Sequence, residues 1–211
     1  MINQKRFSPG LIHYWPFEFG SLTDVIGGVT LYNGNNAGFS KDLTYLSMND
    51  GFYQLPTGIY FYGQDFTVMT WVNIKKYTYS QRFLDMKSSN GDVIIMALST
   101  QATGIPYFSI YLFNQSETRF SASKPIPIGI LQHITYKVNG NMGYIYVNGI
   151  LDVSSPINLV SPSTRTSNYL GKSNWGGDGN AFGDFDEIKI FNRPLSDQEI
   201  LFEMNNFMYN Y

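Results

Sequence analysis

Three acidic residues near the end of the chain have types and spacing that could support catalysis. Asp184, Asp186 and Glu187 fall in a segment of closely spaced apolar residues that predicts a strand. Because side chains alternate along a strand, Asp184 and Asp186 should share one face and Glu187 should lie on the other. A pair of carboxylates is what enzymes that cleave glycosidic bonds use. A glycan-cleaving enzyme is therefore one hypothesis for this chain.

Histidine chemistry is poorly supported by the sequence. The chain has only His13 and His133, and each lies inside a strand-like pattern without a neighbouring nucleophile motif. The chain has no Cys, so a protein zinc site is not expected, and the redox compartment cannot be read from cysteine usage. We expect both histidines to be structural and predict no catalytic residue.

Two loops combine aromatic rings with polar side chains, as sugar-binding sites do. One loop offers Asn174, Trp175 and Asp178, and the other offers Tyr77 and Tyr79. A ring can stack on a sugar while amides and carboxylates bind its hydroxyl groups, so these five residues are the candidate ligand-binding set. The alternative is that Trp175 packs over the edge of the fold, since aromatic residues occur throughout this chain.

The remaining pattern predicts an all-β protein with one closing helix. Short apolar runs are separated by turn signals such as Asn90-Gly91, and no repeated crossover helices are present. The pattern favours an antiparallel two-sheet sandwich. Residues 11–19 read as the first strand, whereas residues 20–40 and 154–168 read mainly as loops. Ser196 and Glu199 form a capping box that predicts a short helix near the C-terminus.

Length and composition limit the classes of partner. A chain of 211 residues fits one domain, which we expect to span residues 11–206, after a lead-in at 1–10 and before an aromatic tail at 207–211. Charged residues are 14%, aromatic residues 17%, and the net charge is −2. Without a basic block, nucleic acid is not an expected partner. No apolar run is long enough for a membrane span, and no signal peptide is visible.

Several segments together resemble a known family. Its closing signature is matched by residues 183–200, its opening strand by 11–18, its central strand by 65–72, and its late hairpin by 132–136 and 144–149. The chain is similar to laminin-G-like jelly rolls of the concanavalin A-like lectin/glucanase superfamily. The resemblance implies a two-sheet jelly-roll sandwich with a short C-terminal helix. The Glu-x-Asp-x-Glu pattern of the superfamily's enzymes is missing.

The resemblance also implies one structural calcium ion. Domains of this kind often hold Ca²⁺ where the loop after the first strand meets the last strand. Asp24 matches the loop acid and Asp186 the last-strand acid. The alternative is an Asx turn at Asp24 and local pairing of Asp186. The sequence departs from the family's common loop, because Val25 and Ile26 replace polar residues.

Taken together, these features favour a non-catalytic, lectin-like binding or adhesion module of an extracellular or cell-surface protein. Its expected ligand is a glycan or a glycoprotein. A second hypothesis is a self-assembling structural subunit of an extracellular filament or coat, suggested by the low charge and by the aromatic tail at residues 207–211. The glycan-cleaving enzyme is the third and weakest.

Overall fold

A computed structural model describes residues 7–61, 63–113, 117–160 and 162–206. The tail at 207–211 and the first six lead-in residues lie outside this range. The elements in chain order are β1 (Leu11–Trp15), η1 (Glu18–Gly20), β2 (Tyr32–Phe39), β3 (Leu46–Leu55), β4 (Phe66–Ile74), β5 (Arg82–Ser88), β6 (Val93–Ala97), β7 (Tyr107–Tyr111), β8 (Thr118–Ser121), β9 (Gln132–Asn139), β10 (Met142–Val147), β11 (Ile150–Pro156), β12 (Arg165–Leu170), β13 (Ala181–Phe191) and α1 (Asp197–Asn205).

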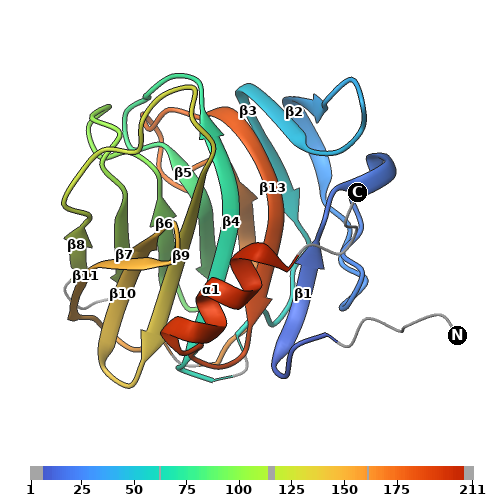
Figure 1. The fold of residues 1–211 in the computed structure, drawn as a ribbon. Coiled ribbons are helices and arrows are strands. Elements are labelled where there is room, and N and C mark those ends of the chain that lie inside the picture. Colours follow the sequence, from blue (N-terminus) through green and yellow to red (C-terminus); the bar gives the residue numbers. More distant parts are fainter. Residues whose placement is uncertain (1–6, 62, 114–116, 161, 207–211) are drawn as a thin grey trace, which may run out of the picture.

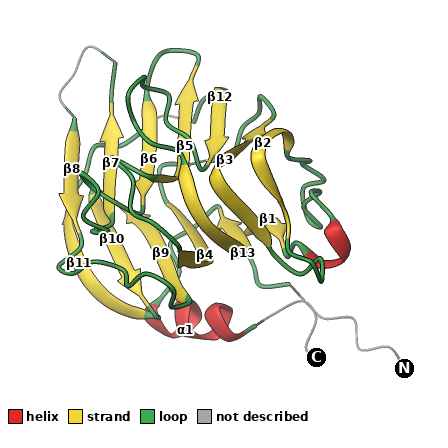
Figure 2. Ribbon diagram, turned by 90° about the horizontal axis from the view of Figure 1, so that it is seen from above, coloured by secondary structure: helices red, strands yellow, loops and turns green. Residues whose placement is uncertain are grey.

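The strands form the two layers of a jelly-roll sandwich, as the sequence predicts (Figure 1). One layer, beside α1, has the order β11-β10-β9-β4-β13, with β1 paired to β13. The other layer has the order β3-β12-β5-β6-β7-β8, with β2 paired to β3. In Figure 2 this second layer lies on the side away from α1. Every strand pair is antiparallel.

The two layers are joined through β3. Its residues Leu46 to Gly51 pair with β13, and Tyr53 to Leu55 pair with β12. At the crossing, Asp50 has φ +58°, and a Cβ on Gly51 would lie 2.2 Å from the carbonyl oxygen of Asn36. Only glycine fits so close to another backbone. The strand can therefore pass between layers while the hydrogen-bonded sheet stays continuous.

The core lies between the layers and follows the alternation of the strands. Inward positions meet across strands, as in the row Leu170, Leu84, Met96, Phe108 and Phe120. Phe83, Phe108 and Tyr136 add aromatic contacts, with ring centroids of Phe108 and Tyr136 5.5 Å apart. Most side chains of this cluster are fully buried. A core of this size makes disulfides unnecessary.

Helix α1 covers the outer face of the first layer. Its start is the predicted capping box: the backbone N–H of Glu199 donates to Ser196 Oγ, and the Glu199 carboxylate accepts from the Ser196 N–H at 2.8 Å. Ile200 packs on Met69, Tyr146, Phe191 and Leu195. Lead-in residues are tied to the same end, since Arg193 Nε donates to the Pro9 carbonyl.

Three sequence-based boundaries were wrong. Residues 20–40 contain β2, and residues 154–168 contain the end of β11 and the start of β12. Conversely, the first strand ends at Trp15, because Phe17 and Phe19 have positive φ and turn the chain into η1. β2 is rich in Asn and Gly and mostly exposed, so it has no apolar alternation to reveal it. Among the described residues, no helix is long and apolar enough to cross a membrane.

Candidate functional site

The outer face of the second layer carries polar and aromatic side chains at the positions that alternate with the core. One cross-strand row runs from β2 to β8 and consists of Tyr32, Gln54, Tyr169, Asp85, Ile95, Ser109 and Arg119. A neighbouring row contains Lys87, Val93 and Tyr111. Because these side chains stand on paired strands, the face is a rigid platform.

A loop of residues 172–180 folds over the middle of this platform and is held there by buried polar contacts. Arg82 donates through Nη2 to Asp178 Oδ2 at 2.8 Å and to Ser173 Oγ at 3.2 Å. Its Nε donates to Asp85 Oδ2 at 2.9 Å. Asn174 donates to the other oxygen of Asp85 at 2.7 Å. Next to the loop, Val93, Ile95, Ala97 and Tyr107 form an apolar cluster outside the main core, and Tyr111 packs against it.

The charges beneath the loop are balanced within the protein. Asp85 is fully buried, and burial raises the pKa of its carboxyl, which the charge of Arg82 and the hydrogen bond from Asn174 oppose. Arg82 bonds at once to Asp85, Asp178, the Ser80 carbonyl and the Tyr107 hydroxyl. A buried charge keeps its place only with such partners. Arg82 is thus the anchor of the loop.

Trp175 belongs to this loop and stays open to solvent. Its side chain is 43% exposed, and its ring meets Tyr111 of β7 edge to face, with centroids 6.3 Å apart. Tyr79, which is 55% exposed, comes from the adjacent loop. The two loops are hydrogen-bonded: Gly179 N–H donates to the Tyr79 carbonyl, and Thr78 Oγ1 to the Asn180 carbonyl. The structure therefore brings the two predicted loops side by side.

The five predicted ligand-binding residues differ in the exposure and the contacts of their side chains. Trp175 and Tyr79 present exposed rings. Asn174 and Asp178 use their side chains to hold the loop, as described above. Tyr77 donates its hydroxyl to the Ile126 carbonyl at 2.6 Å, and its ring lies against Gly104, where a Cβ would come within 2.3 Å. Ligand binding by these residues stays a prediction, and the geometry favours the two exposed rings.

A second aromatic group on this face was missed by the sequence analysis. Phe52 of β3 and Tyr169 of β12 meet edge to face at 6.0 Å, and the Lys172 ammonium lies 4.4 Å from the first ring centroid and 5.0 Å from the second. Beside them, Asn33 donates its amide to Gln54 at 2.7 Å. Their outward positions follow from alternation within each strand, but their proximity depends on strand pairing that no local pattern reveals.

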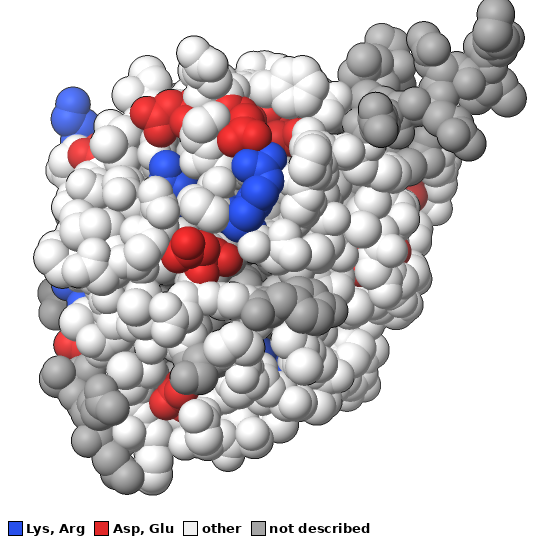
Figure 3. Space-filling view, turned by 90° about the horizontal axis from the view of Figure 1, so that it is seen from below, with Lys and Arg blue, Asp and Glu red and all other residues white. Residues whose placement is uncertain are grey.

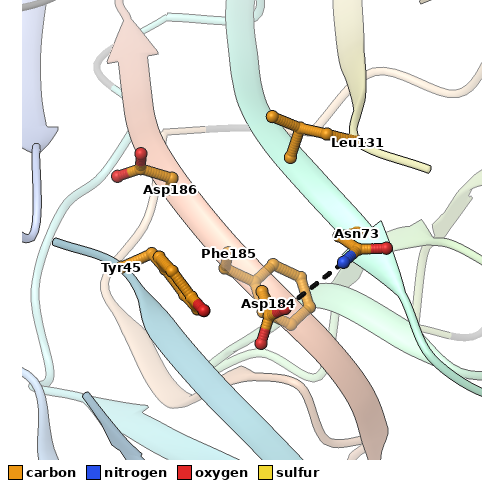
Figure 4. A pocket seen from close by; sticks show the side chains of 6 residues that line it. All are labelled: Tyr45, Asn73, Leu131, Asp184, Phe185 and Asp186. Atoms are coloured by element: carbon orange, nitrogen blue, oxygen red, sulfur yellow. Dashed lines mark hydrogen bonds between the residues drawn. The ribbon is translucent and has the colours of Figure 1, made fainter. Parts of the chain in front are cut away.

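The predicted acids Asp184 and Asp186 do lie on one side of β13. Both line a cavity of about 230 Å³, together with Tyr45, Asn73, Leu131 and Phe185 (Figure 4). Asp184 pairs with Lys75 and accepts a hydrogen bond from Asn73. Burial and the neighbouring Glu187 carboxylate raise the pKa of Asp186 to about 8. Glu187 departs from the strand at φ +52°, in a β-bulge, and accepts from the Tyr14 hydroxyl.

Asp24 makes the Asx turn that was the alternative to calcium binding. Its Oδ1 accepts from the N–H groups of Ile26 at 2.8 Å and Gly27 at 2.6 Å. Its Oδ2 accepts from Val29 N–H at 3.0 Å and lies 2.9 Å from His13 Nδ1. Although burial acts to raise it, these hydrogen bonds hold the Asp24 pKa below its ordinary value.

These contacts bear on the expected calcium ion. Both carboxylate oxygens of Asp24 already face donors, whereas Ca²⁺ takes six to eight oxygen ligands. In the part of the chain that the structure describes, no three His, Asp or Glu side chains gather in a way that could hold a metal. As arranged, Asp24 and Asp186 do not fit a calcium ion, and calcium binding stays an untested prediction.

The histidines are both buried. His13 stacks on Trp15 with a centroid distance of 5.4 Å, and its ring is tilted against that of Tyr60 at 5.2 Å. His133 packs edge to face on Trp71, and burial together with the charge of Lys189 lowers its pKa to about 3.

Charged side chains are sparse on the face of the molecule drawn in Figure 3. Acidic and basic side chains lie next to each other there, within a mostly uncharged surface.

Comparisons with known proteins agree with this fold. The domain 4 structure of AbnA, an extracellular arabinanase of Geobacillus stearothermophilus, in complex with arabinotriose, superposes with a TM-score of 0.76 at 17% identity, covering 92% of this chain and 97% of that one. The binding domain of Paraclostridial Mosquitocidal Protein 1 gives a TM-score of 0.73 at 17% identity, covering 93% and 52%.

A third structure comes from work on botulinum neurotoxin type C entry through interaction with two ganglioside molecules. Its TM-score is 0.71 at 15% identity, covering 95% of this chain and 52% of that one. The chain therefore spans about half of each toxin chain. Among curated proteins, no sequence matches significantly. A family model described as Concanavalin A-like lectin/glucanases superfamily matches residues 47–201. The chain belongs to that superfamily.

Proposed function

We propose that this chain is a non-catalytic glycan-binding module of an extracellular or cell-surface protein. The observation that carries the proposal is Trp175, an exposed aromatic ring held on a loop that Arg82 and Asp85 fix to the sheet. An exposed, preorganised ring loses little conformational freedom when a ligand stacks on it. Its ligand is a glycan, free or carried on a glycoprotein.

The surroundings of Trp175 suit a sugar. Polar side chains flank the loop on both sides, with Arg119 toward β8, and Lys87, Gln54 and Lys172 toward β3. Sugar hydroxyl groups need such donors and acceptors around an apolar ring face. Two structural neighbours support this choice of ligand, since one was solved in complex with arabinotriose and the other comes from work on toxin entry through two ganglioside molecules. The description of one of them as extracellular supports the setting.

Absence of catalysis is part of the proposal. Asp184 and Asp186 lie on β13, in the other layer from the loop that carries Trp175. Asp184 is occupied by Lys75. Even if a sugar bound beside Trp175, these two carboxylates would be across the sandwich from it. An enzyme would need a second sugar site at their cavity.

A glycan array tests the proposal, followed by calorimetry on the best neutral and acidic oligosaccharides and on arabinotriose. Trp175→Ala should weaken binding at least tenfold, which corresponds to about 1.4 kcal/mol. The matched control is Phe202→Ala, which removes an aromatic ring that is 60% exposed on α1. The control should bind like the wild type. Folded wild-type protein that binds no glycan on the array would overturn the proposal.

A second function, self-association, is favoured by one apolar surface. Ile128, Ile130 and Leu131 are about half exposed at the start of β9, and Ile150 is 71% exposed at the start of β11. Leu201 of α1 lies against Gly149 beside them. Contiguous apolar surface usually marks an interface. If the chain assembles through it, Ile150→Lys should convert the assembly into monomers in sedimentation measurements. A wild type that is monomeric at all accessible concentrations excludes this second function.

A further inference from the structure

Arg165, at the start of β12, is a buried cation, and no carboxylate of the described residues forms an ion pair with its guanidinium. The residue is 1% exposed, and backbone hydrogen bonds in both directions with Gly58 fix its position. Its Nη1 has only long contacts, 3.3 Å to the Asp92 carbonyl and 3.5 Å to the Met86 carbonyl. Its Nε and Nη2 are buried and find no hydrogen-bond partner among the described residues.

The charge itself persists at neutral pH. Burial lowers the pKa of Arg165 to about 10, so the guanidinium remains protonated under physiological conditions. An unpaired buried charge is among the costliest features that a fold can carry. Buried donors without partners in a native protein usually bind an ordered water molecule or an ion. Something must therefore satisfy three N–H groups, one on Nε and two on Nη2, and one positive charge.

The neighbouring acid, Asp92, does not satisfy these unpaired donors. Asp92 raises the pKa of Arg165, but its carboxylate is already engaged: Oδ1 accepts from Phe113 N–H at 2.9 Å and Oδ2 from Asn90 at 3.0 Å. Close by in sequence, the Ser163 hydroxyl is also buried and has no hydrogen-bond partner within the part of the chain that the structure describes. Ser163 precedes the first residue of β12 by two positions. A hydroxyl and a guanidinium that both have unpaired donors are a donor set for an anion.

We infer that Arg165 and Ser163 form a binding site for a small inorganic anion of the size of chloride, buried at the end of β12. Such an ion neutralises the guanidinium, which water cannot do, and accepts the N–H and O–H groups that the protein leaves unpaired. Larger or organic anions should be excluded, because the donors are inaccessible to solvent. The site is separate from the glycan surface and does not depend on it.

Thermal unfolding of the full chain in sodium chloride and in sodium gluconate, at equal ionic strength, tests the inference. A ligand that binds only the folded state stabilises it, so chloride should raise the melting temperature by roughly 2–4 °C relative to gluconate. In Arg165→Met, which keeps the volume and removes the charge, the difference should vanish. The control Arg193→Gln, which removes an arginine that is paired with Glu199 at 2.7 Å, should retain it.

Two other results of the melting experiment would contradict the proposed anion site. Equal melting temperatures in the two salts would mean that water meets the unpaired donors. A chloride effect that survives Arg165→Met would place the ion elsewhere. If Arg165→Met does not fold, wild-type crystals grown in bromide give a second reading. Anomalous scattering from bromide within hydrogen-bond reach of the guanidinium supports the inference, and its absence there overturns it.

Discussion

The Nη2 atom of Arg82 lies 2.8 Å from Oδ2 of Asp178, and this ion pair ties strand β5 to the loop that carries Trp175. The same guanidinium contacts Asp85, so one side chain neutralises a buried acid and a loop acid together. The loop in turn contacts Tyr111, which packs against an apolar cluster on the outer face of the sheet. Loop position and the orientation of Trp175 therefore depend on one residue.

This dependence predicts unequal effects for the two partners. Arg82→Gln leaves Asp85 buried without its cation and should lower stability by about 3 kcal/mol, or roughly 6–12 °C in melting temperature. Asp178→Asn keeps a hydrogen-bond acceptor and removes a more exposed charge, so it should cost about 1 kcal/mol. Denaturant unfolding measures both. Equal losses in the two variants would show that Arg82 is not the anchor.

Local signals in the sequence predicted the closing elements well. The capping box at Ser196 and Glu199 is formed by neighbouring residues, so its geometry follows from spacing alone. The loop around Trp175 was found for the same reason, because aromatic, amide and glycine residues cluster within a few positions. The shared face of Asp184 and Asp186 also followed from alternation within one strand.

Features that depend on distant residues could not be predicted. Gln54, Tyr169 and Asp85 are neighbours only because β3, β12 and β5 pair in one register. The contact of Asn174 could not be predicted for a related reason: its amide faces a buried carboxylate 89 positions away in sequence. The β-bulge at Glu187 and the positive φ angles of Phe17 and Phe19 are imposed by packing. None of these three residues is a glycine, so the sequence does not indicate their backbone conformation.

The helix cap gives a prediction with a pH dependence. Hydrogen bonds from Arg193 and from the Ser196 backbone lower the Glu199 pKa to about 2. A carboxyl whose pKa is lower in the folded state stabilises the fold above its unfolded value, near 4.5, and loses that effect as the pH falls toward 2. Glu199→Gln should therefore destabilise at pH 7 and become neutral near pH 2. Ser196→Ala should cost about 1 kcal/mol at pH 7 and less near pH 2, because the Ser196 hydroxyl also donates to the Glu199 carboxylate.

His133 should make the fold sensitive to mild acid. Its folded pKa, about 3, is below the ordinary 6.5, so between these values the unfolded chain binds a proton that the folded chain does not. Stability should fall as the pH drops from 6.5 toward 3. His133→Phe removes the titrating group and keeps the contact with Trp71. Between pH 7 and pH 5, this variant should therefore lose less folding stability than the wild type. Identical pH profiles would show that His133 does not contribute. Since His13 is unchanged in both proteins, the difference isolates His133.

Substitution of Asp24 can distinguish a structural role of this residue from a metal-binding role. Its carboxylate accepts from three loop N–H groups and contacts His13, and Asn would turn an N–H₂ donor toward some of these donors. Asp24→Asn should therefore lower stability by about 2 kcal/mol, or roughly 4–8 °C, equally in Ca²⁺ and in chelator. The calcium prediction requires something different: Ca²⁺ should raise the melting temperature of the wild type by mass action, and Asp24→Asn or Asp186→Asn should remove the rise. Melting curves of the three proteins, each with chelator and with millimolar Ca²⁺, distinguish the two roles. A calcium-dependent rise that both variants abolish would mean that the hydrogen bonds of Asp24 rearrange to admit the ion, and the turn would then be the calcium-free state of that site.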